Sequence, residues 1–415
     1  MENKCKNENE LQKQKAVKKG LIAASRAGIH AQGVAISDDA ATELIEESLF
    51  GMPEATALTG SEKCRLVNEV FCSLRCELGI LTPYLEDESI QEIMVNGPAH
   101  VFLEREGKIL PAACRFESNE ELEEVIRRIA AGVRREINEK TPILDARLQN
   151  GARVNAIYKN IALGTPSLTI RKFPQVSLSM ENLLERGSIT RMAAEFLKRA
   201  TKGGYNIFIS GGTSSGKTTF LNALAEYIPE DERVVVIEDS AELQVSALPN
   251  CVRLECRNAN AEGKGEIGME TLIKTSLRMR PDRIIVGEVR GRECFAMLQA
   301  LNTGHDGSMS TGHANSIEGM LKRLESMFLQ AVEFPMDAIR AQIAEGIDII
   351  VHLGRLPQKG RAVLEIAEIA GYESGKFMIN RIFKYDINEG LLPTGKKLKC
   401  VQKLLLRGMD SDCGL

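Results

Sequence analysis

The first part of the chain carries apolar residues at helical spacing. Two such runs, 37–50 and 61–78, each begin at a serine, Ser37 and Ser61. A serine side chain accepts hydrogen bonds from the free N–H groups of a first helical turn, which favours it at that place. We therefore predict two helices. Residues 1–20 before them carry six lysines, three glutamates and few apolar positions, and this predicts a basic tail.

The pattern changes to alternation after residue 80. Residues 92–110 alternate apolar and polar positions as paired strands do, with turns predicted at Asn96-Gly97 and Glu106-Gly107.

A helix and two further strands complete this region. Ser118 and Glu121 have capping-box spacing and predict a helix that ends near Ala131, before the strand-like sequences RVNAIY and SLTIRKF. The sequence therefore predicts a basic tail and helical segment over 1–79 and an α+β domain over 80–172.

Proline and small polar residues interrupt both periodicities at 173–180, which we interpret as a linker. Strands and helices then alternate to about residue 385, the pattern of a mostly parallel α/β sheet. The predicted second domain spans 181–415.

Composition narrows the class of protein. A net charge of −4, 27% charged residues, 5% aromatics and no tryptophan give no case for nucleic-acid binding. No apolar run reaches the ~20 residues of a membrane span, and no signal peptide is evident, so we expect a cytoplasmic protein without a transmembrane segment. The ten cysteines are scattered without metal-binding spacing and are interpreted as reduced thiols.

The sequence NIFISGGTSSGKTTFLNAL, residues 206–224, joins a predicted strand to a predicted helix. It fits G-x-x-x-x-G-K-[ST], a loop whose backbone N–H groups surround phosphates. The lysine would reach the β- and γ-phosphates, and the threonine after it would hold Mg²⁺. A glycine-rich turn without a ligand is the alternative. The candidate ATP-binding residues are Gly211, Gly212, Thr213, Ser214, Ser215, Gly216, Lys217, Thr218 and Thr219.

Acidic residues end two later strands. RVVVIED supplies Glu238 and Asp239, and DRIIVGE supplies Glu288. A carboxylate at the end of a strand near the phosphate loop can position or activate water, although such acids also cap helices. Two of them after one phosphate loop favour catalysis.

Two of the five histidines, His305 and His313, lie in the glycine- and serine-rich segment LNTGHDGSMSTGHAN. A histidine that donates to a γ-phosphate loses that partner on hydrolysis and can sense it. Histidines unrelated to nucleotide are the alternative.

Four segments in fixed order, GGTSSGKTTFLNAL, VVVIEDSAEL, RPDRIIVGEVRG and LNTGHDGSMSTGHANS, resemble the Walker A, Asp, Walker B and His boxes of the type II/type IV secretion ATPase superfamily. Upstream, TPILDARLQNGARVNAI and SLTIRKF are similar to the CpaF-like branch, the ATPases of tight-adherence (Tad/Flp) pilus assembly. The resemblance spans about residues 80–370 and implies a RecA-like P-loop ATPase domain.

The resemblance also implies roles for single residues. Glu288 would be the catalytic glutamate, Glu238 the Asp-box acid near Mg²⁺ and the water, Thr218 a second Mg²⁺ contact, and His305 and His313 the His-box pair. ATP and Mg²⁺ are the implied cofactors.

Arg147 and Arg153 match arginines that family members bring from the N-terminal domain over the nucleotide. Guanidinium groups neutralise charge on transferring phosphoryl oxygens. Pairing with Asp145 or Glu139 is the alternative reading of these arginines.

Three features depart from the family pattern. The Walker B strand ends Gly287-Glu288 without an aspartate, which weakens the case for a direct Mg²⁺ ligand there. The tetracysteine zinc insert of many type II secretion ATPases is missing, and residues 1–60 match nothing in the family.

The family implies a homohexamer that hydrolyses ATP and drives an inner-membrane platform protein, and through it pilins, from the cytoplasmic face of the membrane. A conjugative DNA-transfer ATPase, a nucleic-acid motor and an ATP-binding scaffold are the alternatives. Residues 395–408, GKKLKCVQKLLLRG, predict a short basic amphipathic helix that packs on its own ring or docks on acidic loops or anionic lipid.

Overall fold

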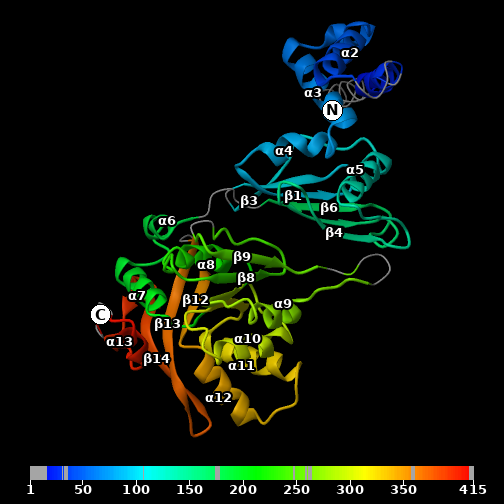
Figure 1. The fold of residues 1–415 in the computed structure, drawn as a ribbon. Coiled ribbons are helices and arrows are strands. Elements are labelled where there is room, and N and C mark those ends of the chain that lie inside the picture. The colour runs from blue at the N-terminus through cyan, green and yellow to red at the C-terminus, as the bar shows by residue number, and fades with distance from the viewer. Residues whose placement is uncertain are drawn as a thin grey trace. The chain divides into compact units, whose positions relative to one another are not determined.

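The computed structural model describes residues 16–29, 31, 36–105, 107–172, 178–245, 248–257, 259, 264–356 and 360–410. The chain divides into two compact units, residues 1–175 and 176–415, each with its own sheet (Figure 1). Residues 1–15 of the predicted tail and 173–177 of the predicted linker lie outside the described residues. No helix in the described ranges is both long and apolar enough to span a membrane.

The first unit begins with helices that share a small core. A helix over 16–29, α2 (Asp38–Phe50) and α3 (Gly60–Arg75) bury apolar side chains against one another. The Ser37 hydroxyl accepts from the Ala40 N–H, so the predicted start of α2 is confirmed.

The predicted start of α3 at Ser61 is wrong. Thr59 caps this helix: its side chain accepts from the Glu62 N–H, while the Glu62 carboxylate accepts from the Thr59 N–H. This reciprocal pair sets the helix start two residues earlier. The helix also ends at Arg75 instead of Leu78, and two short elements, η2 (Gly79–Leu81) and α4 (Thr82–Glu86), follow it.

An antiparallel sheet forms the rest of the first unit, in the order β3-β2-β1-β6-β5-β4. One of its faces packs against α5 (Asn119–Gly132), and the other is largely polar. Ser118 caps α5 as predicted, but the Glu121 carboxylate accepts from the Glu117 N–H, so the capping box is incomplete. The strands are β1 (Ile90–Asn96), β2 (Val101–Arg105), β3 (Lys108–Pro111), β4 (Ile143–Arg147), β5 (Arg153–Ile157) and β6 (Ser167–Arg171).

The second unit has a nine-stranded sheet in the order β15-β14-β13-β12-β7-β11-β10-β8-β9. Neighbours from β12 to β9 pair in parallel, and β12 to β15 pair antiparallel. The strands are β7 (Ile207–Gly211), β8 (Val234–Glu238), β9 (Cys251–Glu255), β10 (Arg283–Val286), β11 (Met309–His313), β12 (Ile349–Leu356), β13 (Gly360–Glu373), β14 (Lys376–Asp386) and β15 (Gly390–Pro393).

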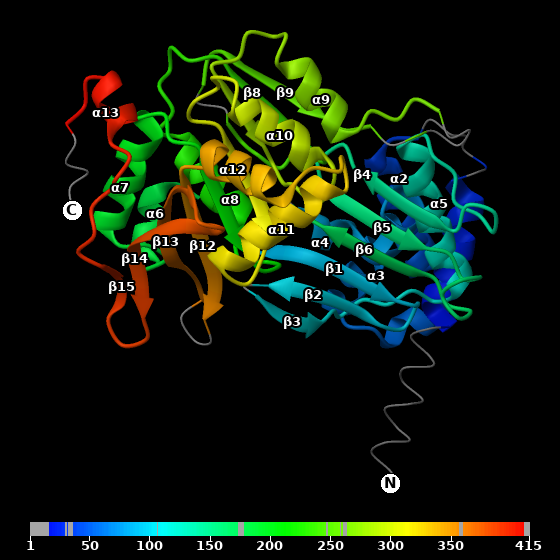
Figure 2. The same ribbon diagram turned by 90° about the horizontal axis from the view of Figure 1, so that it is seen from below.

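Helices cover both faces of this sheet (Figures 1 and 2). One face packs against α6 (Met180–Glu185), α7 (Arg191–Lys202) and α8 (Lys217–Ala225). The other packs against α9 (Met269–Ser276), α10 (Glu293–Leu301), α11 (Ile317–Leu329) and α12 (Met336–Gly346). Burial on both faces explains why β7, β8 and β10 are continuous apolar runs instead of alternating ones. The predicted α/β fold class, with a smaller α+β part and helices before it, is confirmed.

The predicted amphipathic helix over 395–408 is wrong in extent. Only α13 (Gln402–Leu406) is helical, and it packs on the second unit through the fully buried Leu404. The residues before it are held in place because the buried Glu368 carboxylate accepts from the N–H groups of Lys399 and Cys400. Tyr205 O–H adds a hydrogen bond to the Cys400 carbonyl, 2.5 Å away.

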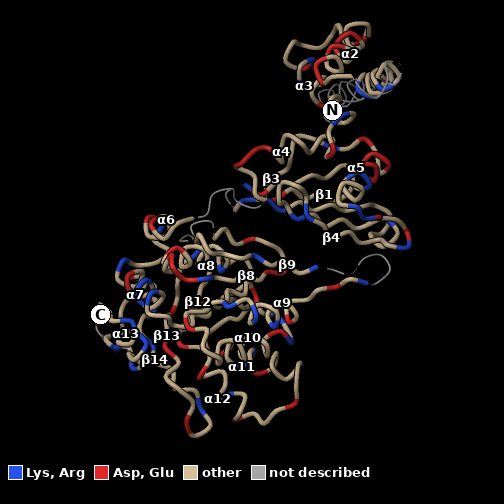
Figure 3. Tube along the Cα trace, viewed as in Figure 1, with Lys and Arg blue, Asp and Glu red and all other residues tan. Residues whose placement is uncertain are grey.

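Two of the basic residues in this segment are used inside the unit. Lys403 lies 2.7 Å from Asp348 and 2.8 Å from Asp306, and Arg407 lies 2.6 Å from Glu232. The trace around α13 carries several Lys and Arg positions (Figure 3). These contacts favour the reading in which the segment packs on its own domain.

Replacement of Leu404 by alanine should therefore lower the free energy of unfolding of the second unit by about 2–5 kcal/mol, because it opens a cavity in the core. Leu406, which is 80% exposed two residues away, is the matched control, and Leu406→Ala should change stability by less than about 0.5 kcal/mol. Urea denaturation of the full chain measures both values. Equal effects of the two substitutions would contradict the packing of α13.

Candidate active site

The site begins where β7 passes into α8. Gly216, the N-cap of α8, has φ +93°, and Ser214 has φ +56°. A Cβ on Gly211 would lie 2.5 Å from Ser215 Oγ and 2.7 Å from the Leu353 carbonyl oxygen, so only glycine fits there. A Cβ on Gly212 would meet nothing within 4 Å. The loop is thus tight at its base and open beside Gly212, as a phosphate cradle requires.

Lys217 lies buried at the base of this loop. Its ammonium donates to the carbonyls of Gly211 and Gly212, at 3.3 and 3.0 Å, and to His313 Nδ1 at 3.1 Å. Burial lowers the pKa of Lys217. Nearby, Ser215 Oγ is buried and has no hydrogen-bond partner in the described part of the chain. A buried cation and an orphaned hydroxyl fit a site that binds an anion.

His313 connects Lys217 to Glu288. Its Nδ1 accepts from Lys217, because an ammonium can only donate, so the proton of the neutral ring lies on Nε2. Nε2 is 2.6 Å from Glu288 Oε1. The β11–β7 register, which pairs His313 with Gly211, brings this imidazole to the phosphate loop.

The two oxygens of the Glu288 carboxylate have different surroundings. Oε2 accepts from Arg290 Nε and Nη2, at 2.9 and 2.6 Å. Oε1 is buried and lies 2.6 Å from His313 Nε2, and within the described ranges no donor forms a hydrogen bond to it. One carboxylate oxygen is thus fixed while the other keeps its capacity to accept a hydrogen bond.

Glu238 is oriented differently from the sequence expectation. Its Oε1 accepts from the N–H groups of Glu242 and Leu243, both at 2.8 Å, and Arg253 Nη2 lies 3.6 Å from Oε2. The side chain is buried, and burial raises its pKa. This carboxylate organises the loop after β8, so its place beside Mg²⁺ and the water stays a prediction without support from its present contacts.

His305 is separated from His313. It precedes β11, at the amino end of the parallel strands, and its Nδ1 lies 3.0 Å from the Ala300 carbonyl oxygen. The five residues of β11, which ends at His313, span roughly 17 Å at about 3.3 Å per residue, and His305 lies before the first of them. His313 thus lies at the phosphate loop and His305 at the amino ends of the parallel strands, and the role of the two as a His-box pair stays a prediction.

Arg147 and Arg153 belong to the first unit. They face each other across the β4–β5 hairpin, and Arg171 of β6 is the next residue in the same row. Arg147 Nε donates to the Gly151 carbonyl at 3.1 Å. Asp145, one of the alternative partners, accepts from Asn155 Nδ2 at 2.6 Å. The hairpin presents two guanidinium groups on the polar face of the sheet.

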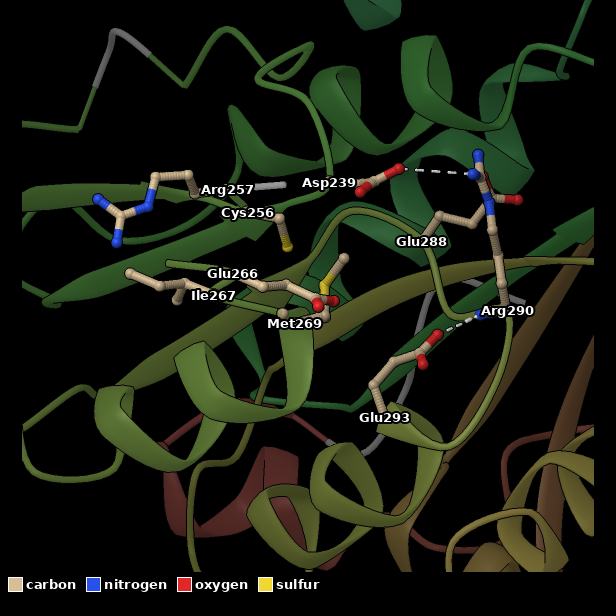
Figure 4. Close-up of a pocket in the computed structure, with 10 residues that line it drawn as sticks. Asp239, Cys256, Arg257, Glu266, Ile267, Met269, Glu288, Arg290 and Glu293 are labelled. Carbon is tan, nitrogen blue, oxygen red and sulfur yellow. Dashed lines mark hydrogen bonds and ion pairs between the residues drawn. The ribbon is translucent and has the colours of Figure 1, made fainter. Parts of the chain in front are cut away.

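A pocket of about 190 Å³ opens beside Glu288 at the carboxyl ends of β8, β9 and β10 (Figure 4). It is lined by Asp239, Cys256, Arg257, Glu266, Ile267, Gly268, Met269, Glu288, Arg290 and Glu293.

Arg290 was missed by the sequence reasoning, and its position two residues after Glu288 was the signal that could have found it. Among the described residues, no cluster of three or more His, Cys, Asp or Glu side chains could hold a metal ion alone.

The chain is similar to proteins of known secretion systems. The family model described as "Type II/IV secretion system protein" matches residues 75–379. An uncharacterised protein of Methanocaldococcus jannaschii is 40% identical over 242 residues, which cover 56% of this chain and 33% of that one. The chain thus matches about a third of the length of that relative.

Two relatives align over most of their length. A probable conjugal transfer protein TrbB of Sinorhizobium fredii is 35% identical over 71% of this chain and 88% of its own. The type IV secretion system protein VirB11 of Brucella suis is 32% identical over 71% of this chain and 90% of its own. The crystal structure of the Yersinia pseudotuberculosis ATPase DotB shares the fold, with a TM-score of 0.53 and 17% identity over 70% of this chain and 79% of its own.

The partly buried imidazole of His313 predicts a pH dependence of stability. Burial lowers its pKa below the ordinary value of about 6.5. Between the lowered value and ~6.5 the unfolded chain binds a proton that the folded chain does not, so the free energy of unfolding should fall as the pH drops through this window. Urea denaturation between about pH 7.5 and 5.5 measures this fall, and His313→Asn should remove part of it. Parallel pH curves for the two proteins would contradict the expectation.

Proposed function

The chain belongs to the type II/IV secretion system protein family, and from this premise we propose that it is an ATP-hydrolysing motor of such a system. The contiguous set formed by Lys217, His313 and Glu288 is the observation that carries the proposal. It joins a phosphate loop to a buried carboxylate, and a protein that only binds ATP needs no such carboxylate.

Each residue of the set has a proposed role. The loop N–H groups from Gly211 to Thr219 and the Lys217 ammonium bind the phosphates, and the N-terminus of α8 adds its partial positive charge. Glu288 Oε1 accepts a hydrogen bond from the attacking water, and Oε2 stays with Arg290. His313 keeps its proton on Nε2. Its Nδ1 accepts from Lys217, so this contact depends on whether the Lys217 ammonium binds a phosphate.

Few protein groups are placed to bind Mg²⁺ in the proposed site. The Thr218 hydroxyl at the start of α8 would hold it, with phosphates and waters as the other ligands, which is how Mg²⁺ is usually bound beside nucleotides. The ion would neutralise phosphate charge. Glu238 would act near it only after releasing the N–H groups of Glu242 and Leu243.

Arg147 and Arg153 would supply positive charge from the first unit to the nucleotide. A homohexamer in which hydrolysis moves the two units of each subunit, at the inner face of the membrane, is the assembly that we propose by resemblance. His305 has no proposed contact with the nucleotide of its own unit.

The resemblance of the boxes to CpaF-like ATPases favours a Tad/Flp pilus motor that acts on an inner-membrane platform protein. A conjugative DNA-transfer motor is the second candidate, because a TrbB protein is 35% identical over most of its length. Capture from native membranes separates the two: a polytopic platform protein and prepilins support the pilus, and a relaxase or coupling protein supports conjugation. Turnover that DNA stimulates would favour conjugation as well.

The roles of Lys217 and Glu288 can be separated by substitution. Lys217→Ala should lose ATP binding, whereas Glu288→Gln should bind ATP and fail to hydrolyse it, because the amide keeps the shape of the side chain but is a poor base. Equilibrium binding of a nucleotide analogue and phosphate release measure the two effects. Near-normal turnover by Glu288→Gln would remove Glu288 from its role.

The arginines of the first unit should matter for rate more than for stability. Arg147→Ala and Arg153→Ala should lower turnover by ~10-fold or more, while the free energy of unfolding changes by less than about 1 kcal/mol, as is usual for partly exposed side chains. A fragment that begins near Gln175 should bind ATP and hydrolyse it slowly. Full activity in this fragment would show that the first unit contributes nothing to the reaction.

A further inference from the structure

We propose that Arg290 is a positioning residue for the proposed hydrolysis: it fixes one oxygen of Glu288 so that the other is presented to the attacking water. The inference rests on the proposed function. Neither the sequence motifs nor the comparisons assign a role to Arg290.

The contact pattern on Glu288 is the first support. Two nitrogens of the guanidinium, Nε and Nη2, donate to the same oxygen, Oε2, at 2.9 and 2.6 Å. A rotation of the carboxylate that exchanged its two oxygens would break both bonds. Oε1 therefore stays on the side of His313, whose Nε2 is 2.6 Å away.

The backbone between the two side chains is the second support. Val289 is buried, and its N–H donates to the Thr311 carbonyl of β11 at 2.9 Å. Thr311 Oγ1 also donates to the Gly287 carbonyl at 2.8 Å. Because Val289 is anchored in the core, the turn has little freedom, and the side chains of its two neighbours meet over it.

Arg290 is held at its backbone and at its guanidinium. Glu293 Oε1, at the start of α10, accepts from the backbone N–H groups of Arg290 and Gly291, at 2.6 and 2.8 Å. The guanidinium Nη1 lies 3.5 Å from Asp239 Oδ2, which follows β8 (Figure 4). The start of α10 thus fixes the backbone of Arg290, and the end of β8 lies beside its side chain.

The chemistry favours arginine at this place. Its planar fork offers two donors in fixed geometry, whereas a lysine offers a point charge on a flexible stem. An ion pair that is half-exposed contributes little to stability, so the benefit of this contact lies in orientation. If Arg290 were only a surface partner of Glu288, its loss would leave the rate unchanged.

The test compares Arg290→Gln with Arg290→Lys in the full chain. Arg290→Gln should lower kcat by about 10- to 100-fold, with KM for ATP changed less than about threefold, because a misplaced base slows chemistry without weakening phosphate binding. Arg290→Lys should recover part of the loss. Arg292→Gln is the matched control, since Arg292 lies two residues on, is exposed and pairs with Glu270 instead, at 2.9 Å. It should keep wild-type kcat.

Each outcome is informative. Wild-type kcat in Arg290→Gln, or an equal loss in Arg292→Gln, would overturn the positioning role. Glu288→Gln in the same assay distinguishes this failure from failure of the proposed function: if that variant hydrolyses ATP normally, the assignment of Glu288 itself is wrong. If the inference is right, adding Arg290→Gln to Glu288→Gln should cause no further loss of rate, because the two residues act as one unit.

Discussion

The register of the parallel strands β7, β8, β10 and β11 brings their carboxyl ends to one edge of the sheet. Backbone hydrogen bonds between neighbouring strands fix this register, and burial on both faces prevents slippage, because a shift by one residue would turn core side chains to the wrong face. The phosphate loop, His313 and the turn that carries Glu288 all start from these strand ends. The distances between these three parts of the site are therefore set first by the register of the sheet and only then by the loops.

The opposite edge of the sheet has a structural task. Arg283 is fully buried there and binds the carbonyls of Thr201 and Gly307, together with the Glu232 carboxylate. Asn206 donates to the Gly346 carbonyl and accepts from the N–H groups of Gly307 and Ser308. His305 lies at this edge. The Arg283 and Asn206 side chains thus use their hydrogen-bonding groups to hold the scaffold together. At the site edge, the buried Ser215 Oγ and Glu288 Oε1 form no hydrogen bond within the described residues, and buried polar groups without a partner are a common feature of ligand sites.

The sequence predicted those features that depend on local order of residues. The phosphate loop, the buried strands, the Ser37 cap and the acid after β10 all follow from neighbours within a few positions. It could not predict that Glu238 turns to the backbone after β8, or that β11 separates the histidines, because these depend on strand order. The prediction of a helix over 395–408 was wrong in extent for a related reason. Apolar spacing does not show that the Glu368 carboxylate, more than 25 residues earlier, accepts hydrogen bonds from the N–H groups of Lys399 and Cys400.

The position of residues 397–407 has a consequence for biosynthesis. Glu368, Tyr205 and Glu232 are held by partners that the ribosome adds at least 30 residues later, and in the last two cases more than 170 residues later. The first unit is complete at residue 175 and has its own core, so it can fold while the second is still being translated. The second unit must wait with a buried carboxylate unpaired and a core face uncovered, in a form exposed to aggregation and proteolysis. The second unit is therefore vulnerable during production until residues 397–407 have been synthesised.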